Sequence, residues 1–196
     1  VTGVLTLSQD PEVLAPNVWF GVLHGVGGQL IFALCLCLTA MWSKTWKAPA
    51  QLLQKLDVKL SMFLCVAMVL QLILGALYRH MIGDEALAPK ATHVLYSHIV
   101  LAVFVLALAI IVGIRFMSSE IPVCKKIGVL LHALVFIQLL LGGGALIAII
   151  VNKGETIPLY EILVTTAHQG NGALLLGVSF LALIWAKRLR CSLQTK

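Results

Sequence analysis

The sequence predicts an all-α integral membrane protein with five transmembrane helices, the last four forming a four-helix bundle with an internal parallel repeat. Of its 196 residues, 60% are apolar and only 11% are charged, and the mean hydropathy is +1.02. Soluble domains carry roughly 25% charged residues. This composition excludes a soluble globular enzyme, a disordered chain and a nucleic-acid-binding module. We therefore expect the lipid bilayer as a partner, and no nucleic acid.

Five apolar stretches are long enough to cross a hydrocarbon core about 30 Å thick as helices. In chain order they are 18–42, 59–81, 93–117, 127–151 and 161–186. Leucine and alanine occur throughout each stretch instead of alternating with polar residues, which favours helices over a membrane β-barrel. The intervening segments are short and carry the proline, glycine and charged residues expected of turns.

This pattern divides the chain into four regions. We expect an outer N-terminal segment at 1–17, a lone helix at 18–42 that belongs to an incomplete N-terminal bundle, a four-helix haem bundle at 59–186, and a cytoplasmic tail at 187–196.

The basic residues indicate how the helices are oriented. Eleven of the 14 lysines and arginines lie in the segments 43–59, 115–126 and 187–196, and six of the eight acidic residues lie on the opposite side. The positive-inside rule then places the N-terminus outside and the C-terminus in the cytoplasm of a bacterial-type inner or plasma membrane. Because no signal peptide precedes the first span, we expect an upstream segment or another chain to supply further helices.

An internal repeat links the second and fourth stretches. Gln-Leu-Ile-Leu-Gly at 71–75 is matched 67 residues later by Gln-Leu-Leu-Leu-Gly at 138–142. Each motif precedes a stretch with a histidine near its outer end, and these histidines, His98 and His168, are 70 residues apart. Both glutamine helices run outward and both histidine helices run inward, so the repeat is parallel.

The first stretch resembles half of a third unit. It carries His24 at a similar depth, and Gly3 precedes that histidine as Gly75 precedes His98. Val1 to Leu5 would then be the outer tip of an absent helix.

Three histidines are candidate ligands because they lie five to seven residues inside a span at the same outer depth: His24, His98 and His168. Ionisable residues inside a membrane are costly and are functional by default. One interpretation is three unrelated histidines bonded to helix backbones. The other is axial ligation of haem iron, which a neutral imidazole suits. A pseudo-two-fold axis relating the two complete repeats would place His98 and His168 on opposite faces of one haem.

For the remaining candidate residues, an ordinary structural or surface role is an alternative to a role in binding. His80 and His93 lie near helix ends, where a solvated imidazole is as plausible as a role, and we expect a structural or interfacial role for His132. Arg79, at the outer end of its span, could pair with a haem propionate or serve as an interface anchor. Zinc or copper is disfavoured because no histidine has a second ligand at helical spacing, and the five cysteines form no CxxC pair.

Four motifs together resemble the heme A synthase family over most of the chain. They are Leu-His-Gly-x-x-x-Gln at 23–29, Gln-Leu-Ile-Leu-Gly-Ala-Leu-Tyr-Arg-His at 71–80, Gln-Leu-Leu-Leu-Gly-Gly at 138–143 and Ala-His-Gln-Gly-Asn-Gly-Ala at 167–173. Members of the family have eight spans in two similar four-helix halves. The resemblance implies that this chain corresponds to the tip of the third span followed by spans four to eight.

The resemblance also implies a function. His98 and His168 would be the axial ligands of a resident heme b, and His24 would be one of two histidines that hold the substrate, heme O. The implied enzyme oxidises a methyl group of heme O to the formyl group of heme A, with electrons passing through the resident haem. The family's other first-half histidine and its catalytic glutamate lie on a span that this sequence lacks, so the catalytic residues are unknown.

Three explanations of that difference remain open: another chain supplies the missing residues, the sequence is a fragment, or the chain is a non-catalytic relative. The main alternative function is a b-type cytochrome subunit that only transfers electrons within a larger membrane complex. A transporter is suggested by the repeat alone. Further partners would be other membrane respiratory or haem-biosynthesis proteins.

Overall fold

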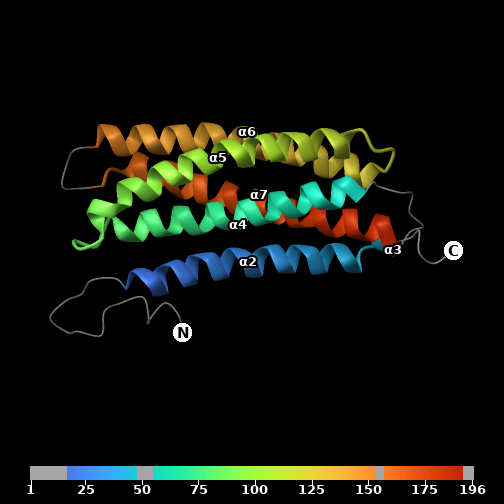
Figure 1. Ribbon diagram of the computed structural model, residues 1–196, viewed down its shortest axis with the longest axis horizontal. Coiled ribbons are helices and arrows are strands. Elements are labelled where there is room, and N and C mark those ends of the chain that lie inside the picture. Colours follow the sequence, from blue (N-terminus) through green and yellow to red (C-terminus); the bar gives the residue numbers. More distant parts are fainter. Residues whose placement is uncertain (1–16, 48–54, 153–156, 192–196) are drawn as a thin grey trace.

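The computed structural model describes residues 17–47, 55–152 and 157–191, and within these residues the chain forms helices and no strand (Figure 1). The helices are α2 (Val18–Trp42), α3 (Lys44–Lys47), α4 (Lys55–Met81), α5 (Ala88–Met117), α6 (Pro122–Val151) and α7 (Leu159–Cys191). The five long ones are apolar and long enough to cross a membrane. The prediction of an all-α multi-pass membrane protein is confirmed. Most of the predicted N-terminal segment, including Gly3, lies outside the described residues.

Four of the five long helices extend beyond the apolar stretches that predicted them, whereas α2 coincides with its stretch. Pro89 and Pro122 stand in the first turns of α5 and α6, where a proline costs little because its missing N–H has no partner within the helix. α7 continues to Cys191 through basic residues of the expected tail. The spans were therefore located correctly, but hydropathy alone does not mark where a helix ends once its charged residues reach the polar interface.

Helices α4 to α7 form a four-helix bundle in which each helix contacts the next and α7 contacts α4. In this ring α5 and α7 stand diagonally opposite each other. α2 packs outside the ring against α4 and α7, along the lower edge of the bundle in Figure 1. Phe32 and Leu36 of α2, for example, lie against Gly177 of α7. The helix at 18–42 is thus in contact with the bundle, and its assignment to a separate N-terminal bundle stays a prediction.

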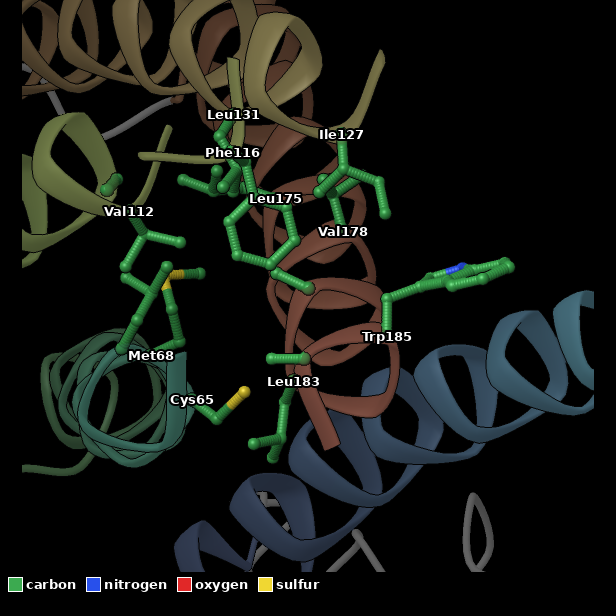
Figure 2. Close-up of a cluster of buried hydrophobic side chains, with 14 of the residues drawn as sticks. Cys65, Met68, Val112, Phe116, Ile127, Leu131, Leu175, Val178, Leu183 and Trp185 are labelled. Atoms are coloured by element: carbon green, nitrogen blue, oxygen red, sulfur yellow. The ribbon is translucent and has the colours of Figure 1, made fainter. Parts of the chain in front are cut away.

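The well-packed part of the bundle is the basic half, where α4 and α6 begin and α5 and α7 end (on the right in Figure 1). Leu64, Phe116 and Leu131 have no exposed surface there, and Leu175 is 1% exposed. Figure 2 shows side chains from α4, α5, α6 and α7 converging in this core. Nearer the helix ends, Arg115 Nε donates a hydrogen bond to the buried Asp57, which ties α5 to α4.

Around the two candidate histidines, the side chains are less completely buried than in the basic half. We call this region the histidine layer, and it comprises residues 69–80, 92–104, 136–144 and 159–170 of the four bundle helices. No side chain in the histidine layer is fully buried. Its apolar side chains are partly buried: Leu72 and Leu101 pack against the main core, and Leu77 and Val94 pack against a smaller cluster of Val18, Val22, Met81 and Ala91.

Candidate functional site

His98 of α5 and His168 of α7 approach each other across the middle of the bundle. Their ring centroids are 6.4 Å apart and their ring planes meet at 70°. Because α5 and α7 are diagonal in the ring of helices, the two imidazoles come from opposite sides of the bundle. The structure thus brings together the two histidines that the repeat related to each other.

The Gln71 side chain of α4 contacts His98. Its Nε2 lies 3.1 Å from His98 Nε2 and donates to the His98 carbonyl oxygen at 3.0 Å. His98 Nδ1 lies 3.2 Å from the backbone oxygen of Gln71. Since a carbonyl oxygen can only accept, Nδ1 carries the proton, and Nε2 offers the lone pair that receives the Gln71 amide.

In the second repeat, Gln138 contacts His168 in a similar way, and a third residue, Asn171, takes part. Gln138 Nε2 of α6 lies 3.2 Å from Nδ1 and 3.3 Å from Nε2 of His168. The buried Asn171 donates to the Gln138 side-chain oxygen at 2.7 Å and to the Leu134 backbone oxygen at 2.9 Å. Asn171 therefore fixes which end of the Gln138 amide faces His168.

One glycine in each repeat makes room for the imidazole. A Cβ added at Gly75 would lie 3.1 Å from His98 Cε1, and a Cβ added at Gly142 would lie 3.1 Å from His168 Cε1. Residues four apart share a helix face, so each Gln-x-x-x-Gly motif presents an amide and bare backbone to one histidine. The repeated motif was recognised in the sequence, but its glutamines and Asn171 were not recognised as partners of the histidines.

One sequence feature could have indicated that the glutamines contact the histidines: in both repeats the Gln-x-x-x-Gly motif comes first and its histidine follows on the next helix. The glutamine precedes its histidine by 27 residues in the first repeat and by 30 in the second. With these separations, the chain leaves one helix, passes through the connecting loop and enters the next, so that the glutamine and its histidine lie at the same depth in the bundle.

The separation of the two rings can be compared with that of two imidazoles bound to one metal ion. An imidazole nitrogen lies about 2 Å from a first-row metal ion, so two rings on opposite sides of one ion have centroids roughly 6 Å apart. The observed separation of 6.4 Å agrees with that arrangement. His98 has a protonated Nδ1 on a carbonyl, the arrangement that orients most metal-binding histidines and leaves Nε2 for the metal.

The structure does not bring His24 to this pair. His24 is exposed on α2, whereas Val22 and Ala33 of the same helix are buried. A Cβ added at Gly25, Gly27 or Gly28 would meet nothing within 4 Å among the described residues. This glycine-rich surface of α2 is thus open in the described part of the chain.

Arg79 is exposed near the end of α4, eight residues beyond Gln71. That separation corresponds to about 12 Å along the helix. Arg79 therefore lies above the histidine pair, toward the end of the bundle, and the structure describes no contact between it and either histidine.

Of the other histidines, His80 and His132 pack against glycines of neighbouring helices. The His80 ring lies on Gly21 of α2, where an added Cβ would be 2.6 Å from its Cε1. His132 Nδ1 donates to the Gly128 backbone oxygen at 2.9 Å, and its ring also packs on Gly113. It borders a shallow depression of about 560 Å³ between α5 and α6, away from His98 and His168. His93 is exposed.

Among the described residues, no group of three or more histidine, cysteine or acidic side chains could hold a metal ion. A haem iron needs only axial ligands from the protein, because the macrocycle supplies the other four nitrogens. The chain matches no protein-family model, no curated protein and no solved structure, so its site is interpreted from its own geometry.

Proposed function

We propose that the chain is the haem-binding part of a membrane oxidoreductase of the heme A synthase type. His98 and His168 are the axial ligands of one b-type haem, which supplies one-electron transfer when bound. The observation that carries the proposal is the 6.4 Å separation of the two rings across the bundle. The Gln-x-x-x-Gly motifs support it, since both place an amide and a glycine against a ligand histidine.

The residues around the pair have distinct roles in this proposal. Gly75 and Gly142 let each imidazole lie close to the neighbouring helix, and Gln71 and Gln138 orient the rings. Arg79 pairs with a propionate at the outer side of the membrane, where the distribution of basic residues puts this end of the bundle.

The open surface of α2 is the part of the chain that we assign to substrate binding. Gly25, Gly27 and Gly28 allow a further helix to approach the backbone closely. We assign His24, on the same part of α2, to the binding of heme O. Helices from another chain or an upstream segment supply the second histidine and the glutamate of the oxidation of heme O to heme A.

One observation favours the second candidate, a b-type cytochrome that only transfers electrons. The described acidic residues of the spans lie near helix ends: Asp57 pairs with Arg115, and Glu161 accepts from Asn152 at 2.8 Å. None of them lies at the depth of His98 and His168. Without a carboxylate from elsewhere, the described residues would support electron transfer without proton transfer to a substrate.

The haem assignment is tested by haem content. The chain is expressed in haem-replete cells, and a pyridine haemochrome spectrum counts b-type haem in the wild type and in the double variant His98→Ala/His168→Ala. His93→Ala, which changes an exposed histidine at the start of the same helix as His98, is the matched control. We expect one haem per chain in the wild type and the control and none in the double variant. Equal haem in the double variant would overturn the proposal.

The enzymatic assignment needs the remaining helices. The chain is co-expressed with a segment that completes the eight spans, heme O is provided, and extracted haems are separated by chromatography and identified by mass. Formation of the formyl haem supports the synthase. A complete preparation that keeps its b-type haem and never forms the formyl product supports the cytochrome instead.

A further inference from the structure

The depression between α5 and α6 contains a histidine that the proposed function does not use. Its volume is about 560 Å³. It is lined by Ile114, Met117, Ser118, Val129, His132 and Ala133. Ile114 and Val129 are more than half exposed, so the depression opens on the outer surface of the bundle, which faces lipid in a membrane. A ligand of this depression therefore enters from the bilayer.

His132 of α6 offers a hydrogen-bond acceptor to this depression. Its Nδ1 lies 2.9 Å from the Gly128 backbone oxygen, which can only accept, so Nδ1 carries the proton. The Nδ1–Cε1 edge of the ring packs on Gly113. The other nitrogen, Nε2, keeps its lone pair and has no hydrogen-bond partner among the described residues. Because an ionisable side chain inside a span is costly, this lone pair is a candidate contact for a ligand.

Ser118, at the end of α5, offers a second acceptor. Its hydroxyl donates to the Ile114 backbone oxygen at 2.9 Å, which uses its one proton and leaves the lone pairs of Oγ. Helices α5 and α6 pack side by side and run in opposite directions. Ser118 reaches back along α5 toward the middle of the bundle, and His132 reaches back along α6 toward Gly128 and the basic end. The two acceptors therefore approach each other in depth and line one depression.

We propose that this depression binds a quinol, a flat apolar ring with two hydroxyl groups, from the surrounding bilayer. Both polar groups accept hydrogen bonds, so the ligand that fits them donates two. A quinol has two hydroxyl donors, whereas the oxidised quinone has two carbonyl acceptors that would face other lone pairs. Ile114 and Ala133 supply apolar walls, and the Met117 thioether suits an aromatic ring. The volume of the depression lies within the range of roughly 300–1,000 Å³ that is typical of ligand sites.

The preference for the reduced form is the first test. The full chain is placed in lipid nanodiscs and titrated calorimetrically with duroquinol under anaerobic conditions and, separately, with duroquinone, and the heats of empty nanodiscs are subtracted. We expect saturable binding of duroquinol and roughly tenfold weaker binding of duroquinone, because the oxidised form loses both hydrogen bonds. Equal or tighter binding of duroquinone overturns the proposal. Uptake of duroquinol that never saturates also overturns it, since the molecule then only partitions into the bilayer.

The two acceptors are tested one at a time. His132→Leu and Ser118→Ala should each weaken duroquinol binding roughly fivefold, which is the effect of one hydrogen bond. His93→Leu and Ser97→Ala are the matched controls and should leave the affinity unchanged. Both control residues are exposed, and the Ser97 hydroxyl also donates to the backbone oxygen four residues earlier, at 2.9 Å. Unchanged affinity in either His132→Leu or Ser118→Ala overturns the assignment of two acceptors.

A further variant fills the depression and leaves its polar groups in place. Ala133→Phe should abolish saturable binding, whereas Ala107→Phe, at an exposed residue of α5 outside the depression, should not. Full binding in Ala133→Phe overturns the location, and thermal unfolding in detergent checks that each variant is folded. The depression lies away from His98 and His168, so the double variant His98→Ala/His168→Ala should bind duroquinol as the wild type does. The quinol site and the proposed haem site therefore stand or fail separately.

Discussion

The basic half and the histidine layer use the same four helices in opposite ways. In the basic half, Leu64, Phe116 and Leu131 are fully buried, and the helices touch through apolar side chains. In the histidine layer no side chain is fully buried, and the glutamine, histidine and glycine contacts lie beside partly buried apolar side chains such as Leu72, Leu77 and Val94. The tightest apolar packing therefore lies in the basic half, and the glutamine–histidine contacts lie in the histidine layer.

The properties of the lipid bilayer explain why the two halves of the bundle are held together by different kinds of contact. Helices in a membrane associate through close packing and polar contacts, because lipid tails are as apolar as leucine. The basic half supplies the close packing, for example where Gly113 and Gly128 bring α5 and α6 together. The histidine layer supplies hydrogen bonds from Gln71 and Gln138, which position side chains more than they compact the bundle.

The largest expected effect is a cavity in the basic half. Phe116→Ala should lower the free energy of unfolding by about 3–5 kcal/mol, because it removes a fully buried aromatic ring. Unfolding in mixed detergent micelles, followed by circular dichroism, measures the change. Phe104→Ala on the same helix is the control, since Phe104 is 62% exposed and should change stability much less. Equal losses in the two variants would mean that the basic half is not the stabilising region.

Breaking the ion pair of the basic half should have a smaller effect. Asp57→Asn removes the charge that Arg115 pairs with, and a bond to a charged group is worth about 1.5–3 kcal/mol. We expect a loss near 2 kcal/mol in the same unfolding assay, with the haem spectrum unchanged. A changed spectrum would show that the two regions are coupled more closely than their separation suggests.

Two neighbouring glycines sharpen the comparison within the histidine layer. Gly142→Ala places a Cβ 3.1 Å from His168 Cε1, whereas an added Cβ at Gly143 meets nothing within 4 Å. Overpacking costs about 1–3 kcal/mol, and we expect the low end of that range together with a loss of low-spin haem in Gly142→Ala. Gly143→Ala should keep the wild-type spectrum and be up to about 1 kcal/mol more stable, since alanine favours the helix.

The smallest expected effect lies at the rim of the basic half. The Arg188 guanidinium stands 5.0 Å from the ring centroid of Trp46, whose ring is 4.8 Å from that of Trp185. Arg188→Gln should cost about 0.5–1 kcal/mol, the value of an exposed cation–π contact. A shift in tryptophan fluorescence should accompany that loss. An unchanged emission spectrum would mean that this contact does not form in solution.

The sequence was sufficient to predict the spans and the repeat because both depend on residue type and order. Hydropathy located the five helices, and the recurring Gln-x-x-x-Gly motif related α4 to α6. The repeat also predicted that His98 and His168 lie on opposite faces of one haem, which stays a prediction, and the structure places their rings 6.4 Å apart.

The contacts that distinguish the two repeats were not predicted. Asn171 looks like any small polar residue in a glycine-rich stretch, and its bond to Gln138 depends on how α6 and α7 are rotated toward each other. The short helix α3 and the packing of α2 against α7 were missed for the same reason. Side-chain contacts between helices depend on rotation and tilt, which composition does not specify.

The most direct test of the central claim is the electron paramagnetic resonance spectrum of the ferric, haem-loaded protein. Two imidazoles on one iron give a low-spin signal, and we predict that signal in the wild type and its absence in His98→Ala and in His168→Ala. A low-spin signal that persists unchanged in either variant would show that the two rings, 6.4 Å apart in the bundle, do not share an iron.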